Sequence, residues 1–83
     1  MHYNFDLTRA VREAVNSFEG EFTVREVLNE VRKAHPEVPK TATTEIALRL
    51  NALALRREII KVRRGTGGAP SLYRRNYQGP GSW

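Results

Sequence analysis

The sequence predicts a small α+β domain in which three helices are followed by a β-hairpin. Apolar residues recur at helical spacing through residues 7–57, whereas from Ile60 onward they alternate with basic residues at every second position. The chain has 83 residues and no cysteine, which suits one domain without a disulfide framework. We therefore expect a single domain over residues 1–76 and a flexible C-terminal tail over residues 77–83.

The first helix is expected from Leu7 to Ser17. Its apolar residues recur at steps of three and four, the spacing of one helical face. Asp6 carries a short acidic side chain of the type that caps a helix N-terminus. Gly20 ends this segment, and residues 21–23 are long enough only for a short strand.

The start of the second helix has the most complete local signal in the chain. Thr23 and Glu26 have the spacing of a capping box, and Phe22 and Val27 have the spacing of a hydrophobic staple. The helix must stop before Pro36, because the residue preceding a proline is pushed out of helical geometry.

A third helix is expected from Thr41, as its N-cap, to about Arg57, after a loop over residues 35–40. At 100° per residue this helix has two distinct faces. Its core face consists of aliphatic residues, namely Ile46, Leu50 and Leu53. Its opposite face mixes small polar and large aliphatic side chains, namely Thr41, Thr44, Leu48, Asn51 and Leu55.

The hairpin is predicted from alternation of β-branched and basic residues over residues 60–63. This alternation places Lys61 and Arg63 on one face of the first strand. Residues 65–70 have the composition of a flexible glycine-rich loop, and residues 71–75 read as the returning strand.

The net charge of +5 is unevenly distributed. Residues 1–38 hold five bases and seven acids, whereas residues 39–83 hold nine bases and two acids. Such polarity is typical of a domain whose basic end meets a polyanion, although a solvated basic surface that promotes solubility has the same composition. The bases of the first two helices are mixed with acids and are expected to lie on solvated faces: Arg9, Arg12, Arg32 and Lys33.

Two stretches near the C-terminus carry a resemblance to a known family. Residues 50–53 (Leu-Asn-Ala-Leu) are followed by residues 57–60 (Arg-Glu-Ile-Ile), and residues 67–74 form a Gly/Pro-containing tip followed by Tyr-Arg. In these stretches, and in the order of its elements, the chain over residues 6–75 resembles the winged helix-turn-helix domains of small transcription regulators. It departs from them at Glu58, where relatives often have a left-handed glycine.

The resemblance implies that the chain binds duplex DNA. The third helix would enter the major groove, and the hairpin, or wing, would lie along the minor groove or the backbone. The loop over residues 35–40 is longer than the usual turn between such helices, which affects their angle. The residues expected to contact DNA are Lys40, Thr41, Thr44, Leu48, Arg49, Lys61, Arg63, Arg64, Arg74 and Arg75.

A different class of function is compatible with the same elements. Leu48 and Leu55 share the outward face of the third helix and would form a docking surface in a protein-interaction module. Thr41 would then act only as a helix cap, and the hairpin cations would only blunt an edge strand. For the DNA-binding function we expect a homodimer, since one short helix and one wing make few contacts.

Catalysis is not expected. His2 and His35 lie in a terminus and a loop, without the partners of a metal or nucleophile site, so neither a cofactor nor a metal is predicted. The longest apolar run has four residues, too few to span a bilayer, and no secretory signal is recognised. We expect a cytoplasmic protein, associated with the nucleoid if it binds DNA.

Overall fold

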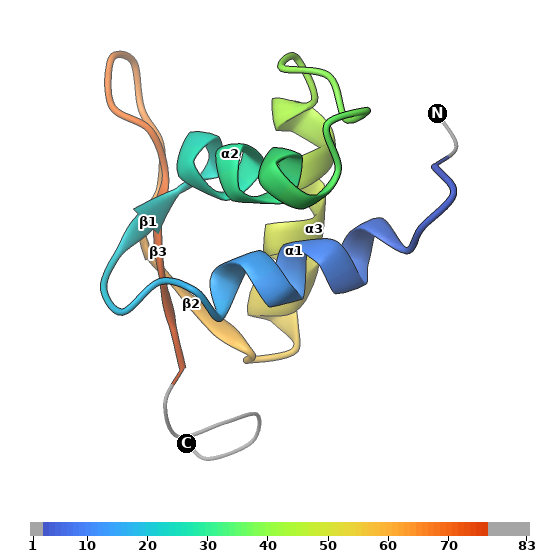
Figure 1. The fold of residues 1–83 in the computed structure, drawn as a ribbon. Helices are drawn as coiled ribbons and strands as arrows, with labels where there is room; N and C mark the ends of the chain where they lie inside the picture. The colour runs from blue at the N-terminus through green and yellow to red at the C-terminus, as the bar shows by residue number, and fades with distance from the viewer. Residues whose placement is uncertain (1–2, 77–83) are drawn as a thin grey trace.

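The computed structural model describes residues 3–76 and contains three helices and a three-stranded antiparallel sheet (Figure 1). This confirms the predicted α+β class, while the predicted tail over residues 77–83 lies outside the described residues. Within residues 3–76, no helix has the length and apolarity needed to cross a membrane. The elements are α1 (Leu7–Val15), β1 (Phe22–Thr23), α2 (Val24–Ala34), α3 (Thr43–Leu55), β2 (Ile59–Arg63) and β3 (Leu72–Arg75).

The predicted starts of α1 and α2 are confirmed. The Asp6 side chain accepts a hydrogen bond from the backbone N–H of the first turn of α1. In α2 the Thr23 hydroxyl accepts from the backbone N–H of Glu26, whose carboxylate accepts from the backbone N–H of Thr23. The end of α1 is two residues earlier than predicted, at Val15, because the N–H and hydroxyl of Ser17 both donate to one carbonyl and form a turn.

The prediction that Thr41 caps α3 is wrong. The helix begins at Thr43, its N-cap is Ala42, and no side chain bonds to its first turn. The backbone N–H of Ala42 donates to the Pro39 carbonyl at 3.1 Å, so a separate turn precedes the helix. Val38 and Ala42 are both buried, which anchors this turn to the core and delays the helix start.

The C-terminus of α3 has a left-handed residue at Arg57, whose φ is 62°. Its N–H donates to the Ala54 carbonyl, and the N–H of Glu58 donates to the Leu53 carbonyl, both at 3.0 Å. This pair of bonds is the Schellman motif, in which the residue after the C-cap takes the left-handed conformation. The left-handed residue is therefore Arg57, one position before the place where the related domains often have a left-handed glycine. The helix ends at Leu55, two residues before its predicted end at about Arg57.

The sheet order is β1-β3-β2, so the central strand is the last one in the chain. Lys61 pairs with Tyr73 and Arg63 pairs with Leu72, with a register shift between the two pairs. Because Tyr73 and Leu72 are adjacent in β3, they project to opposite faces of the sheet. The prediction that Lys61 and Arg63 share a face is therefore wrong, because the extra residue forms a bulge.

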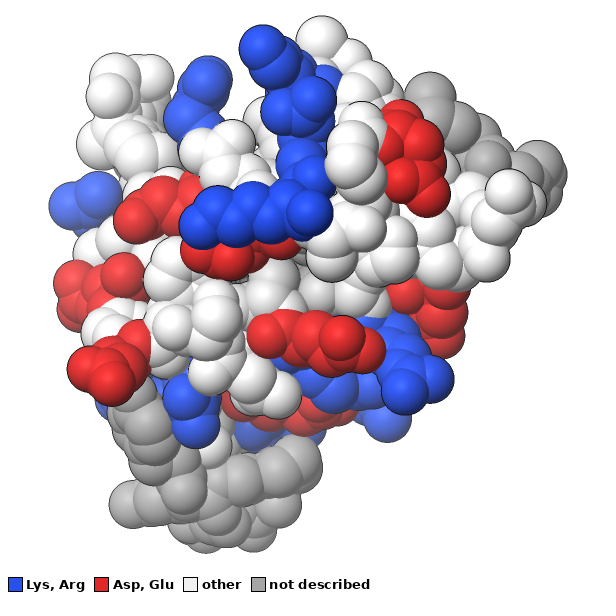
Figure 2. Space-filling model, viewed as in Figure 1, with Lys and Arg blue, Asp and Glu red and all other residues white. Residues whose placement is uncertain are grey.

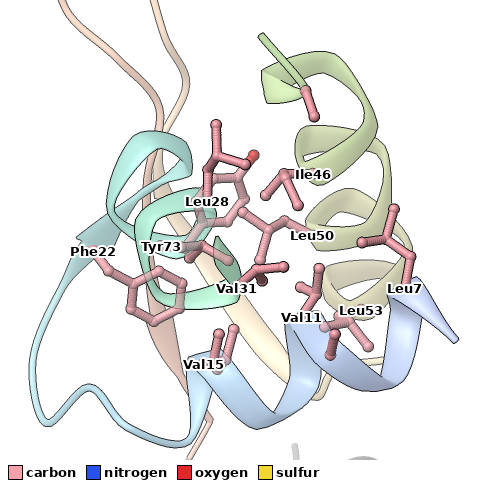
Figure 3. Close-up of a cluster of buried hydrophobic side chains, with 14 of the residues drawn as sticks. Leu7, Val11, Val15, Phe22, Leu28, Val31, Ile46, Leu50, Leu53 and Tyr73 are labelled. Carbon is pink, nitrogen blue, oxygen red and sulfur yellow. The ribbon is translucent and has the colours of Figure 1, made fainter. Parts of the chain in front are cut away.

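One hydrophobic core lies between the three helices and the sheet (Figure 3). Ile46 and Leu50 of α3 are fully buried and Leu53 is 1% exposed, as the helical spacing predicts. Phe22 of β1 and Tyr73 of β3 close the core on the sheet side, with ring centroids 6.3 Å apart. The core thus holds α3 and the β2–β3 hairpin in fixed relative positions.

An ion pair joins α1 to the turn before β2. The Arg12 guanidinium donates two hydrogen bonds to the Glu58 carboxylate, at 2.7 and 3.1 Å, and Arg56 lies 3.4 Å from the same carboxylate. The bonds to Glu58 raise the pKa of Arg12 above its ordinary value. On α2, Arg32 donates to the Val38 carbonyl at 2.7 Å. Arg12 and Arg32 therefore position loops, which corrects their prediction as solvated helix faces.

Candidate nucleic-acid interface

A groove of about 350 Å³ separates α3 from the β2–β3 hairpin. The N-terminal end of α3 and the tip of the hairpin lie at the same end of the molecule (Figure 1). The groove therefore runs between the first half of the helix and the hairpin. Its lining residues come from four elements and the hairpin loop: Val24, Thr43, Thr44, Ala47, Asn51, Lys61, Pro70, Ser71 and Tyr73.

Four basic side chains of the hairpin are exposed: Lys61, Arg63, Arg64 and Arg74. No carboxylate of residues 3–76 forms a salt bridge with any of them. Lys61 faces the groove, with its Nζ 5.6 Å from the centroid of the Tyr73 ring. Arg63 and Arg74 project from the other face of the hairpin, as their register requires. The hairpin is therefore cationic on both faces.

The tip of the hairpin is narrow and carries no large side chain. Thr66 and Ala69 exchange two backbone hydrogen bonds, which close a two-residue turn within the predicted glycine-rich loop. Gly67 in this turn has a φ of +34°. A Cβ at Gly65 would lie 2.9 Å from the backbone N and the Oγ of Ser71, so the two arms approach too closely for a side chain.

The outward face of α3 carries no charge. Thr44, Leu48 and Leu55 lie on it at steps of four and seven residues, and all three are exposed. The relative exposure of Leu48 is 57% and that of Leu55 is 86%. Lys40 and Thr41 are exposed in the turn that precedes the helix. The predicted DNA-contacting face of α3 is thus accessible. The exposed cations predicted to contact DNA lie outside the helix, in the preceding turn and in the hairpin.

Asn51 lines the groove although it was not among the predicted DNA contacts. The Tyr73 hydroxyl donates to Asn51 Oδ1 at 3.1 Å and holds the amide against the sheet side of the groove. Tyr73 is 1% exposed, and burial raises the pKa of its phenol, which favours the protonated donor form. Its helical position already placed Asn51 on the outward face, but its contact with Tyr73 depends on a strand 22 residues away in sequence.

Two of the predicted DNA-contacting arginines lie away from the groove. Arg49 is two residues from both Ala47 and Asn51, hence about 160° around the helix from these groove-lining positions. Its Nε is buried without a hydrogen-bond partner. Arg75 donates to the carbonyl oxygens of Asn16 and Phe18, so it ties the distal end of β3 to the end of α1.

The opposite side of the molecule has a different charge pattern. Figure 2 shows the face formed by α1 and α2, where acidic and basic side chains lie next to one another. Arg9 forms an ion pair with Glu13 at 3.2 Å, and Lys33 forms one with Glu30 at 2.9 Å. A polyanion approaching this face would meet carboxylates as well as cations.

His35, in the loop after α2, stacks on the Phe5 ring, with centroids 3.7 Å apart. Among the described residues, no three histidine or acidic side chains gather closely enough to hold a metal ion. Neither a protein-family model nor a curated protein matches the sequence. The function is therefore inferred from the groove and the charges around it.

Proposed function

We propose that this protein is a winged-helix protein that binds duplex DNA. The order helix, strand, helix, helix, hairpin supports this assignment, as does a sheet in which the short β1 pairs with the returning strand of the hairpin. In this proposal the N-terminal half of α3 enters the major groove and the β2–β3 hairpin is the wing. The observation that carries the proposal is the set of exposed hairpin cations that have no carboxylate partner within residues 3–76 and lie beside an accessible helix.

The wing is suited to a narrow groove bordered by two phosphate backbones. Lys61 lies on one face of the hairpin, Arg63 and Arg74 lie on the other, and Arg64 precedes the tip. Each cation that neutralises a phosphate releases a condensed counterion, which favours binding. Since the tip has no large side chain, the backbone can approach the DNA closely, and arginine is favoured in a narrow minor groove.

The start of α3 provides the second contact region. Backbone N–H groups at a helix N-terminus are partly positive, and this helix has no side-chain cap to occupy them. Lys40 and Thr41 are exposed in the adjoining turn, and Thr44 lies in the groove. The backbone N–H groups, Lys40 and Thr41 suit phosphate contacts that fix the position of the helix, while the outward residues of α3, including Thr44, face the base edges.

The protein acts in this proposal as a small transcription regulator, in the compartment that holds the chromosome. One helix and one wing cover few base pairs, so a homodimer would read two half-sites.

The second candidate function is a protein-interaction module. It is favoured by the exposure of Leu48 and Leu55 on one face of α3, with no charge between them. In that case both leucines would be buried by a protein partner, and the hairpin cations would be dispensable. A Leu55→Asp variant separates the two functions, because it should abolish partner binding but leave a monomer's affinity for DNA within about twofold.

The test of DNA binding is a mobility shift on a mixed-sequence duplex. The double variant Arg63→Glu/Arg64→Glu should lose the shift, because two phosphate contacts become repulsive. The matched control Arg9→Glu/Lys33→Glu makes the same change in net charge on the α1/α2 face and should retain it. Equal binding by both double variants would refute the assignment of the hairpin as the wing, and no shift by the wild-type protein would refute DNA binding.

A further inference from the structure

The charge-free outward face of α3 restricts which base pairs it can read. In the major groove, guanine is recognised mainly by arginine or lysine, which donate to its O6 and N7 atoms. The exposed residues of α3 are Thr44, Leu48, Ala52 and Leu55, and none of them is a cation. Arg49, which is the one basic residue within α3, lies on the flank away from the groove with its Nε buried.

We propose that the protein prefers A·T-rich duplex DNA and that Leu48 contributes to this preference by packing on the C5-methyl group of thymine. This inference rests on the proposed DNA-binding function. The thymine methyl is the one apolar group that a base pair of unmodified DNA presents in the major groove. Leu48 is 57% exposed, so its side chain has apolar area to bury on such a methyl.

In this arrangement Asn51 does not recognise adenine. Asparagine recognises adenine with both amide atoms, one donating to N7 and one accepting from N6. Asn51 Oδ1 already accepts from the Tyr73 hydroxyl at 3.1 Å, which holds the amide on the wall of the groove. Base reading by α3 is therefore left mainly to methyl contacts and to the Thr44 hydroxyl.

Leu48 is better placed than Leu55 for this contact. Leu48 lies one turn after Thr44, which lines the groove beside the wing. Leu55 is the last residue of α3, seven residues and about 10 Å further along the helix axis. Because the N-terminal part of a recognition helix contacts the base edges, Leu55 falls beyond the reading region. Leu55 therefore serves as the control for Leu48, because both are exposed leucines of α3 but only Leu48 lies in the region expected to contact base edges.

The wing favours the same class of DNA for a separate reason. A·T tracts have a narrow minor groove whose strong negative potential attracts arginine. The exposed arginines on the hairpin, Arg63, Arg64 and Arg74, would benefit from it. Minor-groove preference depends on groove width, whereas the contact of Leu48 depends on a methyl in the major groove, so the two contributions can be separated.

The experiment compares four duplexes of equal length by fluorescence anisotropy. Two are A·T-rich and differ only in having thymine or uracil, and two are G·C-rich and differ only in having cytosine or 5-methylcytosine. Wild-type protein should bind the uracil duplex about fourfold more weakly for each contacted methyl lost. It should bind the 5-methylcytosine duplex more tightly than its unmethylated counterpart.

Two variants assign the effect to a residue. Leu48→Ala, at an exposed helical position, should abolish the difference between thymine and uracil, whereas Leu55→Ala should keep it. Equal wild-type binding to thymine and uracil duplexes would overturn this inference and leave DNA binding intact. A difference that survives in Leu48→Ala would also overturn it. Absence of binding to all four duplexes would instead overturn the proposed function itself.

Discussion

The two sides of this domain use similar basic residues in opposite ways. On α1 and α2, Arg9 and Lys33 are paired with carboxylates on their own helices, and Arg12 is paired with Glu58 across the fold. On the hairpin, Lys61, Arg63, Arg64 and Arg74 have no carboxylate partner within residues 3–76. We call the first region the scaffold face and the second the hairpin face.

The difference shows that the location of a cation matters more than the net charge. A paired cation on the scaffold face stabilises a helix or a turn, and its field is largely cancelled a few ångströms away. An unpaired cation on the hairpin face repels its neighbours in the free protein, and a polyanion relieves that repulsion. Substitutions should therefore separate the two faces, with stability affected on one and binding on the other.

The largest effect on stability is expected from Glu58→Gln. Glu58 is 21% exposed and accepts both bonds from Arg12, so the substitution leaves a half-buried guanidinium with a neutral partner. We expect a loss of about 1–3 kcal/mol in the free energy of unfolding, measured by urea titration. The exposed pair partner Glu13→Gln is the control and should cost at most about 0.5 kcal/mol. Equal losses in the two variants would show that the Arg12 pair is not a structural link.

A smaller effect, on binding, is expected from Gly65→Ala. The new Cβ would lie 2.9 Å from two atoms of Ser71, so the arms of the hairpin must separate. We expect DNA affinity to fall about three- to tenfold, equivalent to about 1 kcal/mol, while the core stays intact. Gly68→Ala is the matched control, since nothing lies within 4 Å of its Cβ. Anisotropy titrations measure both; wild-type affinity in Gly65→Ala would contradict the role given to the hairpin geometry.

The smallest effect, on the free energy of unfolding, is expected from Arg57→Gly in the turn between α3 and β2. Arg57 is held at a φ of 62°, which costs a non-glycine residue about 1 kcal/mol. Glycine should raise the free energy of unfolding by up to about 1 kcal/mol and change DNA affinity little. A thermal melt with a lower Tm than the wild type would show that contacts of the Arg57 side chain outweigh the backbone strain.

Local signals in the sequence predicted much of the fold. The capping box of Thr23 and Glu26 and the buried stripe of α3 depend only on residues three or four apart, and both are confirmed. The hairpin follows from the change of period after Glu58 and is also confirmed. Such features need no knowledge of the remaining chain.

The errors arose where a contact joins distant parts of the chain. Arg12 and Glu58 are 46 residues apart, and no spacing rule connects them. The bulge between Lys61 and Arg63 depends on the register with β3. The left-handed turn at Arg57 lacks the glycine that usually marks it, so the bonds to α3 carbonyls decide its place.

Only part of the candidate site could be predicted, because its other features depend on contacts between distant parts of the chain. The accessible face of α3 and the cations of the hairpin follow from helical and strand spacing. The groove between them, the contact of Asn51 with Tyr73, and the removal of Arg49 and Arg75 from the groove all depend on tertiary packing. Sequence therefore identified the chemistry of the region but not its full set of residues.

The salt dependence of duplex affinity tests most directly whether the hairpin face binds DNA. For the wild-type protein we expect log affinity to fall linearly with log salt, with a slope of magnitude about 3–6 per protomer. Arg63→Gln/Arg64→Gln should lower that magnitude by about 2, whereas Arg9→Gln/Lys33→Gln on the scaffold face should leave it unchanged. A wild-type slope near zero, or an equal decrease in both double variants, would contradict the separation of the two faces.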